Sequence, residues 1–115
     1  MAMKKNTVTA PRNLIAENQL CEAIKQKRVV RLRYENDFTD RVFHPYIIYQ
    51  SQTGKILVHG LQIQNMGSPF DQAEPHKFEI GKISSIQIMP DAFSVDIRFD
   101  RNRKEYVGRT ICVVS

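Results

Sequence analysis

The nine residues from Lys55 to Ile63, Lys-Ile-Leu-Val-His-Gly-Leu-Gln-Ile, form the longest β-branched and aliphatic run of the chain. Turn-forming sequences bound it, Ser51–Gly54 before and Asn65–Pro69 after, so the run has the length of a strand. Apolar side chains fall on both faces of such a strand, and each face therefore needs cover. We expect this run to be the central strand of a small closed sheet.

The size and composition of the chain are those of one globular domain. With 115 residues, of which 42% are hydrophobic and 25% are charged, the chain is neither disordered nor a membrane protein by composition. No apolar run reaches the length of a membrane span, and the basic N-terminus Met1–Asn6 lacks the apolar segment of a signal peptide. We therefore expect a cytoplasmic protein with no membrane partner.

The cysteines and histidines do not form a metal-binding pattern. Cys21 and Cys112 lie far apart and match neither a zinc-ligand spacing nor a disulfide framework, so each is expected to be a small buried apolar side chain. His44, His59 and His76 are isolated, as structural histidines usually are. The sequence predicts no metal site and no cofactor.

The net charge of +5 is unevenly distributed along the chain. Residues 1–33 carry a net charge of +6, residues 34–96 carry −4, and residues 97–115 carry +3. If both basic ends fold onto one face, their Lys and Arg side chains can bind nucleic-acid phosphates by displacing counterions. The alternative is that the basic excess only keeps the protein soluble.

The N-terminal part of the chain predicts a tail, a helix and a strand. Residues 1–12 are polar without periodicity, which indicates a flexible basic tail. From Asn13 to Lys27 apolar residues recur on one helical face, and Asn13 is a suitable N-cap. Residues Val29–Glu35 alternate between apolar and polar, so they predict an antiparallel strand with one face in water.

Three more strands, besides those at Val29–Glu35 and Lys55–Ile63, complete the predicted sheet: Arg41–Tyr49, His76–Ile80 and Ser84–Met89. Pro45 lacks a backbone donor, so its strand should have a free side or a bulge there. The segment from Asn65 to Pro75 is expected to be a loop. Five short strands with short connections favour a small antiparallel barrel, because closure removes exposed edges.

The last quarter of the chain, residues 91–115, predicts a C-terminal β extension that packs on the barrel or on a partner. Alternation from Phe93 to Phe99 indicates a sixth strand, and Gly108–Val114 indicates a seventh.

Several segments together resemble a WYL domain over about residues 18–90: Leu20–Ile24, Arg28–Tyr34, Arg41–Tyr46, Tyr49–Gly60 and His76–Ile83. The resemblance implies a mainly β fold, an Sm-like five-stranded antiparallel barrel with one N-terminal helix, over residues 13–90. WYL domains are regulatory modules of bacteria and phages. They are usually attached to a winged helix-turn-helix DNA-binding domain and are thought to sense nucleic acids or nucleotide-like ligands.

The chain departs from the family pattern at two places. The Trp-Tyr-Leu triplet that gives the family its name is replaced by Ile56-Leu57-Val58. Glu79 stands where the family has an arginine, and this reversal of charge disfavours a phosphate there. Lys77 and Lys82 occupy basic positions of the family and are carried over as ligand contacts.

The predicted ligand- or nucleic-acid-binding residues are basic or aromatic: Arg31, Arg33, Arg41, Tyr46, His76, Lys77 and Lys82. Arginine and lysine can meet phosphates, and tyrosine can stack on bases. The alternatives are that the arginines form a solvated strand face and that the tyrosines line the rim of the core.

The sequence holds no glycine-rich phosphate loop and no nucleophile beside a base, so we predict no enzyme and no catalytic residues. We expect a non-catalytic regulatory module that binds nucleic acid or a nucleotide-like ligand. The alternative is a protein-interaction or oligomerisation module, in which Thr110–Val114 completes the sheet of a second copy or of a partner protein.

Overall fold

The computed structural model describes residues 9–65 and 73–115, and within them the chain is mainly β with one α-helix and six antiparallel strands. The elements are α1 (Leu14–Gln26), β1 (Arg28–Tyr34), β2 (Arg41–Gln50), β3 (Ile56–Asn65), β4 (Glu74–Glu79), the 3-10 helix η2 (Ile80–Lys82), β5 (Ile83–Ala92) and β6 (Thr110–Val113). Most of the predicted tail (residues 1–8) and most of the predicted loop (residues 66–72) lie outside the described residues.

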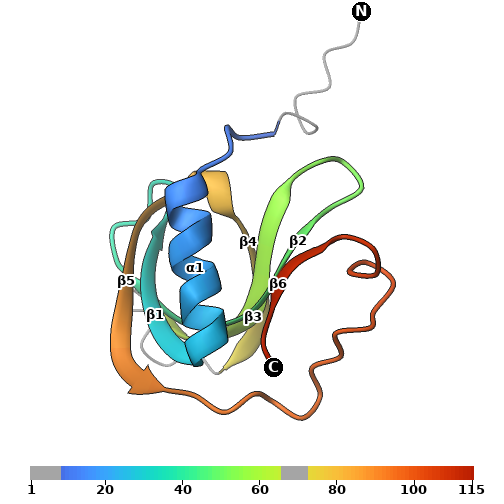
Figure 1. Cartoon of the computed structure of the whole chain (residues 1–115). Coiled ribbons are helices and arrows are strands. Elements are labelled where there is room, and N and C mark those ends of the chain that lie inside the picture. The colour runs from blue at the N-terminus through green and yellow to red at the C-terminus, as the bar shows by residue number, and fades with distance from the viewer. Residues whose placement is uncertain (1–8, 66–72) are drawn as a thin grey trace, which may run out of the picture.

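The strands form an open, strongly curved sheet in the order β4-β3-β2-β1-β5, and β6 pairs with β2 (Figure 1). The predicted closed barrel is not found, because the two edge strands β4 and β5 do not pair with each other in this sheet. The helix η2 separates these two strands along the chain, and β5 pairs with β1 instead. Curvature brings the sheet around the core without joining its edges.

The middle strand of the sheet is β2, so the prediction that Lys55–Ile63 is central is wrong. That run forms most of β3, which lies between β2 and β4. The strand β2 pairs with β1 through Arg41–Phe43 and with β6 through Ile47–Tyr49. Pro45 lies between these two pairings, at a register shift against β3, as expected for a residue without a backbone donor.

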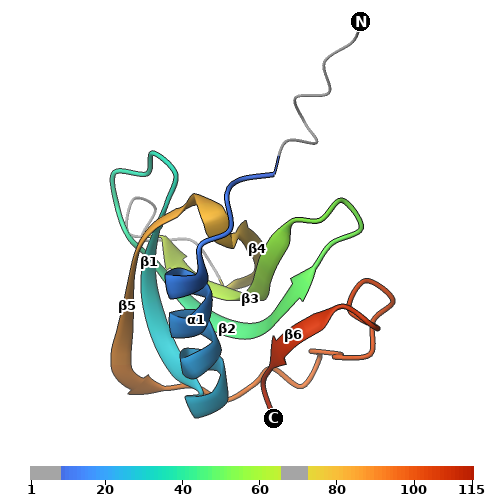
Figure 2. The same ribbon diagram turned by 45° about the horizontal axis from the view of Figure 1, so that its top comes forward.

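The helix α1 lies across the open side of the curved sheet and packs against β1, β2, β5 and β6 (Figures 1 and 2). Its predicted N-cap is confirmed, since the Asn13 side chain accepts a hydrogen bond from the backbone N–H of Ala16 at 3.1 Å. Lys27 adopts the left-handed conformation that ends the helix. No helix in the described ranges has the length and apolar character needed to cross a membrane.

Alternation along β1 places apolar side chains inside and arginines outside, as predicted. Val30 and Leu32 are fully buried, whereas Arg31 and Arg33 face outward. The core lies between α1 and the concave face of the sheet, and its largest members include Leu20, Ile24, Leu32, Phe43, Ile48, Phe78 and Ile80.

The C-terminal segment contains one strand rather than two. The predicted strand Gly108–Val114 is confirmed as β6, but the predicted strand Phe93–Phe99 is wrong. Phe93 is buried in the core, while Ile97 is 98% exposed, so the segment does not present an alternating face. Asp96 also accepts a hydrogen bond from the backbone N–H of Arg98, which forms a local turn in place of a strand.

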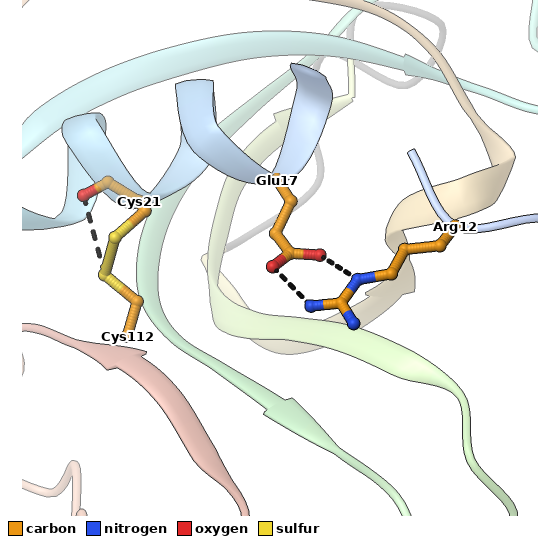
Figure 3. Close-up of a disulfide and its surroundings, with 4 residues drawn as sticks. All are labelled: Arg12, Glu17, Cys21 and Cys112. Atoms are coloured by element: carbon orange, nitrogen blue, oxygen red, sulfur yellow. Dashed lines mark hydrogen bonds and ion pairs between the residues drawn. A yellow bond between two sulfur atoms is a disulfide. The ribbon is translucent and has the colours of Figure 1, made fainter. Parts of the chain in front are cut away.

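Cys21 on α1 and Cys112 on β6 form a disulfide, which corrects the prediction of two unlinked apolar side chains (Figure 3). Cys112 is buried as expected, with 5% of its surface exposed. Spacing could not reveal the bond, because the two residues are 91 positions apart and only the packing of α1 beside β6 brings them together.

Candidate ligand-binding site

A cavity of about 230 Å³ lies between β3 and the C-terminal segment. Its lining, which we call the aromatic pocket, consists of Tyr46, His59, Gly60, Leu61, Pro75, Asp96, Arg98, Phe99, Asp100, Arg103 and Tyr106. The strands β2, β3 and β4 supply one wall and residues 96–106 supply the other. The second wall explains why the outward face of β3, which carries His59, is partly covered.

Three aromatic rings define the shape of the aromatic pocket. The ring centroids of Tyr46 and Phe99 are 5.1 Å apart, and those of Phe99 and Tyr106 are 6.2 Å apart. The Tyr46 hydroxyl accepts a hydrogen bond from the backbone N–H of Asp96 at 3.0 Å, which attaches the C-terminal segment to β2. The rings are therefore held by packing and by hydrogen bonds, so they form a preset surface for a planar ligand.

His59 and Tyr106 form a hydrogen-bonded pair at this cavity, between Nδ1 and the phenol hydroxyl. Burial lowers the pKa of His59, and the nearby Lys77 lowers it further. Burial also raises the pKa of Tyr106. Both groups are therefore neutral at pH 7, and the pair presents hydrogen-bonding groups rather than charge.

The charges in the aromatic pocket are balanced, since Asp96 and Asp100 face Arg98 and Arg103. Arg98 pairs with Asp96 at 2.8 Å, and hydrogen bonds from its side chain and backbone lower the pKa of Asp96 to about 2. Arg103 instead pairs with Glu105 at 3.2 Å, outside the pocket lining. This cavity suits a neutral ring better than an anion.

A second, wider cavity of about 490 Å³ lies against the same C-terminal segment and has a basic lining. We call it the cationic recess, and its residues are Tyr49, Ser51, Gln52, Thr53, Leu57, Lys77, Lys104, Glu105 and Arg109. The lining thus contains three cations and one carboxylate. Among the described residues, no ion pair involves Lys104 or Arg109, so their charges are available to a ligand.

Glu105 is the one carboxylate of the cationic recess, and it is already engaged. It accepts a hydrogen bond from Lys77 at 2.7 Å and pairs with Arg103. Burial opposes its ionisation, but the hydrogen bond and charge of Lys77 and the charge of Arg103 outweigh burial and lower the pKa of Glu105. The same hydrogen bond raises the pKa of Lys77, so both groups are charged at pH 7.

The two cavities adjoin along β3. Leu57 lines the cationic recess, whereas His59 and Leu61 line the aromatic pocket. These residues alternate along one strand face, where neighbours lie about 7 Å apart. His59 also pairs across the ladder with Lys77 of β4, so a residue of the aromatic pocket lies beside one of the cationic recess.

Of the predicted site residues, Tyr46 lies in the aromatic pocket and Lys77 lies in the cationic recess. Lys82 lies elsewhere, 3.7 Å from the buried carboxylate of Glu79. Glu79 also accepts a hydrogen bond from the backbone N–H of Ala10, which ties the N-terminal segment to the end of β4.

The three predicted arginines lie together around the turn between β1 and β2, away from both cavities, and carboxylates neutralise them. Arg31 and Arg33 share Asp40, at 3.3 and 3.0 Å. Arg41 pairs with Asp37 at 2.8 Å, and its guanidinium lies over the Phe78 ring. Arg31 and Arg33 are both partly exposed, but Nε of Arg31 is buried and has no hydrogen-bond partner among the described residues.

His76, the remaining predicted residue, packs its ring on Phe78 beside Arg41, and burial and the charge of Arg41 lower its pKa. Its contacts therefore belong to the arginine group rather than to the cavities. In the described part of the chain, no group of three or more His, Cys, Asp or Glu side chains is arranged to hold a metal ion.

Comparison with protein-family models, curated proteins and solved structures returns no match.

Sequence reasoning missed most of the residues that line the two cavities. The sequence predicts an isolated structural role for His59 and a strand at Phe99. It places Arg109 in the strand Gly108–Val114 and assigns no site role to Lys104 or Tyr106, although all three line the cavities. Tyr106 gives a usable signal in the sequence. It lies between the mostly charged residues 101–105 and Gly108, and a large aromatic side chain in such a segment needs a buried place.

Proposed function

We propose that the protein is a non-catalytic regulatory module that binds a nucleotide-like ligand. The observation that supports this proposal is the pairing of an aromatic cavity with an adjoining recess that carries excess positive charge. Aromatic side chains stack on nucleobases, and Lys and Arg form charge-assisted hydrogen bonds with phosphate.

The size of the aromatic pocket favours one planar ring. Its volume of about 230 Å³ is smaller than the roughly 300–1,000 Å³ of pockets that enclose a drug-sized ligand. A base would occupy this pocket against the Phe99 ring, where the charges of the lining cancel. The phosphate would then lie in the cationic recess near Lys104 and Arg109.

The proposal includes the WYL-like, Sm-like assignment and a cytoplasmic role in bacterial transcription regulation. It is supported by the order of the elements, in which α1 precedes five strands that pair as β4-β3-β2-β1-β5. Within this proposal the ligand contacts differ from those carried over from the family, because only Tyr46 and Lys77 of the predicted set line the two cavities.

Calorimetric titration with adenosine monophosphate and with adenosine tests the proposal. The wild-type protein should bind the nucleotide more tightly than the nucleoside. Phe99→Ala should weaken both by roughly 5- to 150-fold, the equivalent of about 1–3 kcal/mol for one stacked base. The double variant Lys104→Gln, Arg109→Gln should weaken only the nucleotide.

Lys25→Gln is the matched control, because Lys25 is an exposed cation on α1 that lines neither cavity. It removes one positive charge and should leave both affinities unchanged. A single-stranded RNA tetramer gives the nucleic-acid arm of the same titration, with strong salt dependence expected if it binds. If neither nucleotide, nucleoside nor RNA binds at low salt, the proposed function is wrong.

Exposed apolar residues of the C-terminal segment favour a protein-interaction module as the second candidate. Ile97, Val107 and Ile111 are 98%, 63% and 43% exposed. The strand β6 already pairs with β2 of its own chain, and its other edge has no partner among the described strands. Light scattering on wild type and Ile111→Lys tests whether this edge joins two copies; a monomer in both would remove the self-association version.

A further inference from the structure

The disulfide joins α1 to β6, the strand that follows the C-terminal segment of the candidate site. Cys21 lies on α1 and Cys112 on β6, and the strand that carries Cys112 ends the segment that forms one wall of both cavities (Figure 3). That segment contributes Phe99, Arg103 and Tyr106 to the aromatic pocket and Lys104 and Arg109 to the cationic recess. The shape of the site therefore depends on where the segment is held.

Few backbone contacts hold the segment apart from the disulfide. The four residues of β6 pair with β2 at three positions, and residues 93–109 contain no helix or strand. Its other backbone groups bond at a few points: the Phe93 N–H to the Lys27 carbonyl at 2.9 Å, the Asp96 N–H to the Tyr46 hydroxyl at 3.0 Å, the Val114 N–H to the Tyr46 carbonyl at 2.8 Å, and the Arg109 carbonyl to the Gln50 N–H at 3.1 Å. A segment with little regular structure opens at a lower free energy than the central strands do.

Buried side chains keep the closed arrangement populated when the covalent link is absent. Tyr106 and Val114 are fully buried, and Tyr106 packs against Tyr49 with ring centroids 4.8 Å apart. Loss of the link should therefore shift a local equilibrium rather than unfold the chain. The disulfide sets how much of the protein holds the complete site.

We propose that the Cys21–Cys112 disulfide is a redox-controlled clamp on the C-terminal segment. The oxidised protein holds residues 93–114 against β2 and β3, and both cavities are complete. Reduction lets the segment open, and the apparent association constant for the ligand falls in proportion to the fraction of molecules that remain closed. The consequence for ligand binding rests on the proposed function, whereas the opening itself does not.

The chemistry is thiol–disulfide exchange with a dithiol reductant. Cys21 is partly exposed and Cys112 is buried, so a thiolate of the reductant attacks Sγ of Cys21 and releases the Cys112 thiolate. The second thiol of the reductant then displaces Cys21 from the mixed disulfide. The two protons of the dithiol end on the two cysteines, which gain two electrons, and the reductant becomes a disulfide.

Hydrogen exchange on the oxidised protein and on the protein in dithiothreitol tests the opening without any ligand. We expect the amides of Gln50, Asp96 and Val114, which are bonded to or within the segment, to exchange at least about tenfold faster after reduction. The amide of Glu35, bonded to the Lys82 carbonyl, lies away from the segment and should keep its rate. Equal rates in both states, or loss of protection at Glu35 as well, would overturn the clamp.

Titration with adenosine monophosphate tests the consequence for binding. Reduction and the variant Cys21→Ser should both weaken binding by about tenfold if about a tenth of the molecules stay closed, and reoxidation of the wild type should restore it. If the oxidised protein binds no nucleotide, the proposed function fails and the exchange rates alone decide the clamp. If Cys21→Ser does not fold, the affinity of the folded wild type for adenosine monophosphate before and after reversible reduction still tests the proposal. An affinity that reduction leaves unchanged would contradict it.

Discussion

His59 of β3 and Tyr106 of the C-terminal segment form a hydrogen-bonded pair 47 positions apart in the chain. The hydroxyl of the fully buried Tyr106 has no other hydrogen-bond partner among the described residues, so this bond satisfies it in either His59 tautomer. Tyr106→Phe keeps the ring but leaves Nδ1 of the partly buried imidazole unpaired. We expect it to lower the free energy of unfolding by about 1–2 kcal/mol in urea titrations.

Tyr49→Phe is the matched control for this substitution. The Tyr49 hydroxyl makes a longer hydrogen bond, 3.4 Å, to the partly exposed Glu105, and water can replace it. Its removal should cost less than the removal of the Tyr106 hydroxyl. A Tyr49→Phe variant as destabilised as Tyr106→Phe would argue against the buried pair.

The histidines make stability depend on pH. Burial lowers the pKa of His44, His59 and His76 below the ordinary value of 6.5. The unfolded chain therefore takes up more protons than the folded chain as the pH falls through 6.5, so the full stability is present above that pH and declines below it. The slope can reach about 1.4 kcal/mol per pH unit for each histidine.

Urea unfolding between about pH 8 and pH 5 measures this dependence, since His titrates in this range and carboxylates titrate mainly below it. His44→Phe should flatten the decline, because the His44 ring stacks on Phe93 at 4.7 Å and a phenyl ring can take its place. Stability that does not change over this range would show that the histidines are not buried as described.

Gly60 allows β2 and β3 to approach each other closely. A Cβ at this position would meet the His44 carbonyl and come within 2.9 Å of the Phe43 ring. Gly60→Ala should therefore cost about 1–3 kcal/mol in unfolding free energy, as overpacking does. Gly81→Ala serves as the comparison, because its clash is with residues 10 and 11, which form no strand and can move aside.

Glu105 limits the positive charge of the cationic recess by pairing with Lys77 and Arg103. Glu105→Gln should raise the affinity for adenosine monophosphate several-fold and leave adenosine unchanged, since only the phosphate meets the freed charge. The same substitution should lower the pKa of Lys77 towards its ordinary value, because the hydrogen bond that raises it is weakened. An equal gain for adenosine would show that the phosphate does not lie in the recess.

Local patterns in the sequence identified the helix and the six strands of the described residues, and wrongly added one at Phe93–Phe99. The alternation of Val30 and Leu32 with Arg31 and Arg33 places a strand face in the core, and Asn13 marks the start of a helix. These features depend on neighbouring residues, so they can be recognised before the fold is known.

Features that depend on distant contacts were not predictable in the same way. Apolar residues on both faces of β3 indicate that both faces are buried. They do not tell whether β3 is the middle strand or, as observed, the neighbour of the middle strand β2. The pairing of β2 with β6, and with it the Cys21–Cys112 bond, follows from how the whole sheet curves. Tyr46 and Lys77 were found among the candidates, whereas Phe99, Lys104 and Arg109 are brought to the site only by the path of the C-terminal segment.

Amide NMR shifts during a titration with adenosine monophosphate test the central claim, that the ligand lies between β3 and the C-terminal segment. The account predicts shifts at residues 57–61, 75–77 and 96–109, with the Phe99 and Tyr106 ring protons moving as well. Shifts that instead gather around Arg31, Arg33 and Arg41 would place the ligand on the outer strand face and would contradict the account.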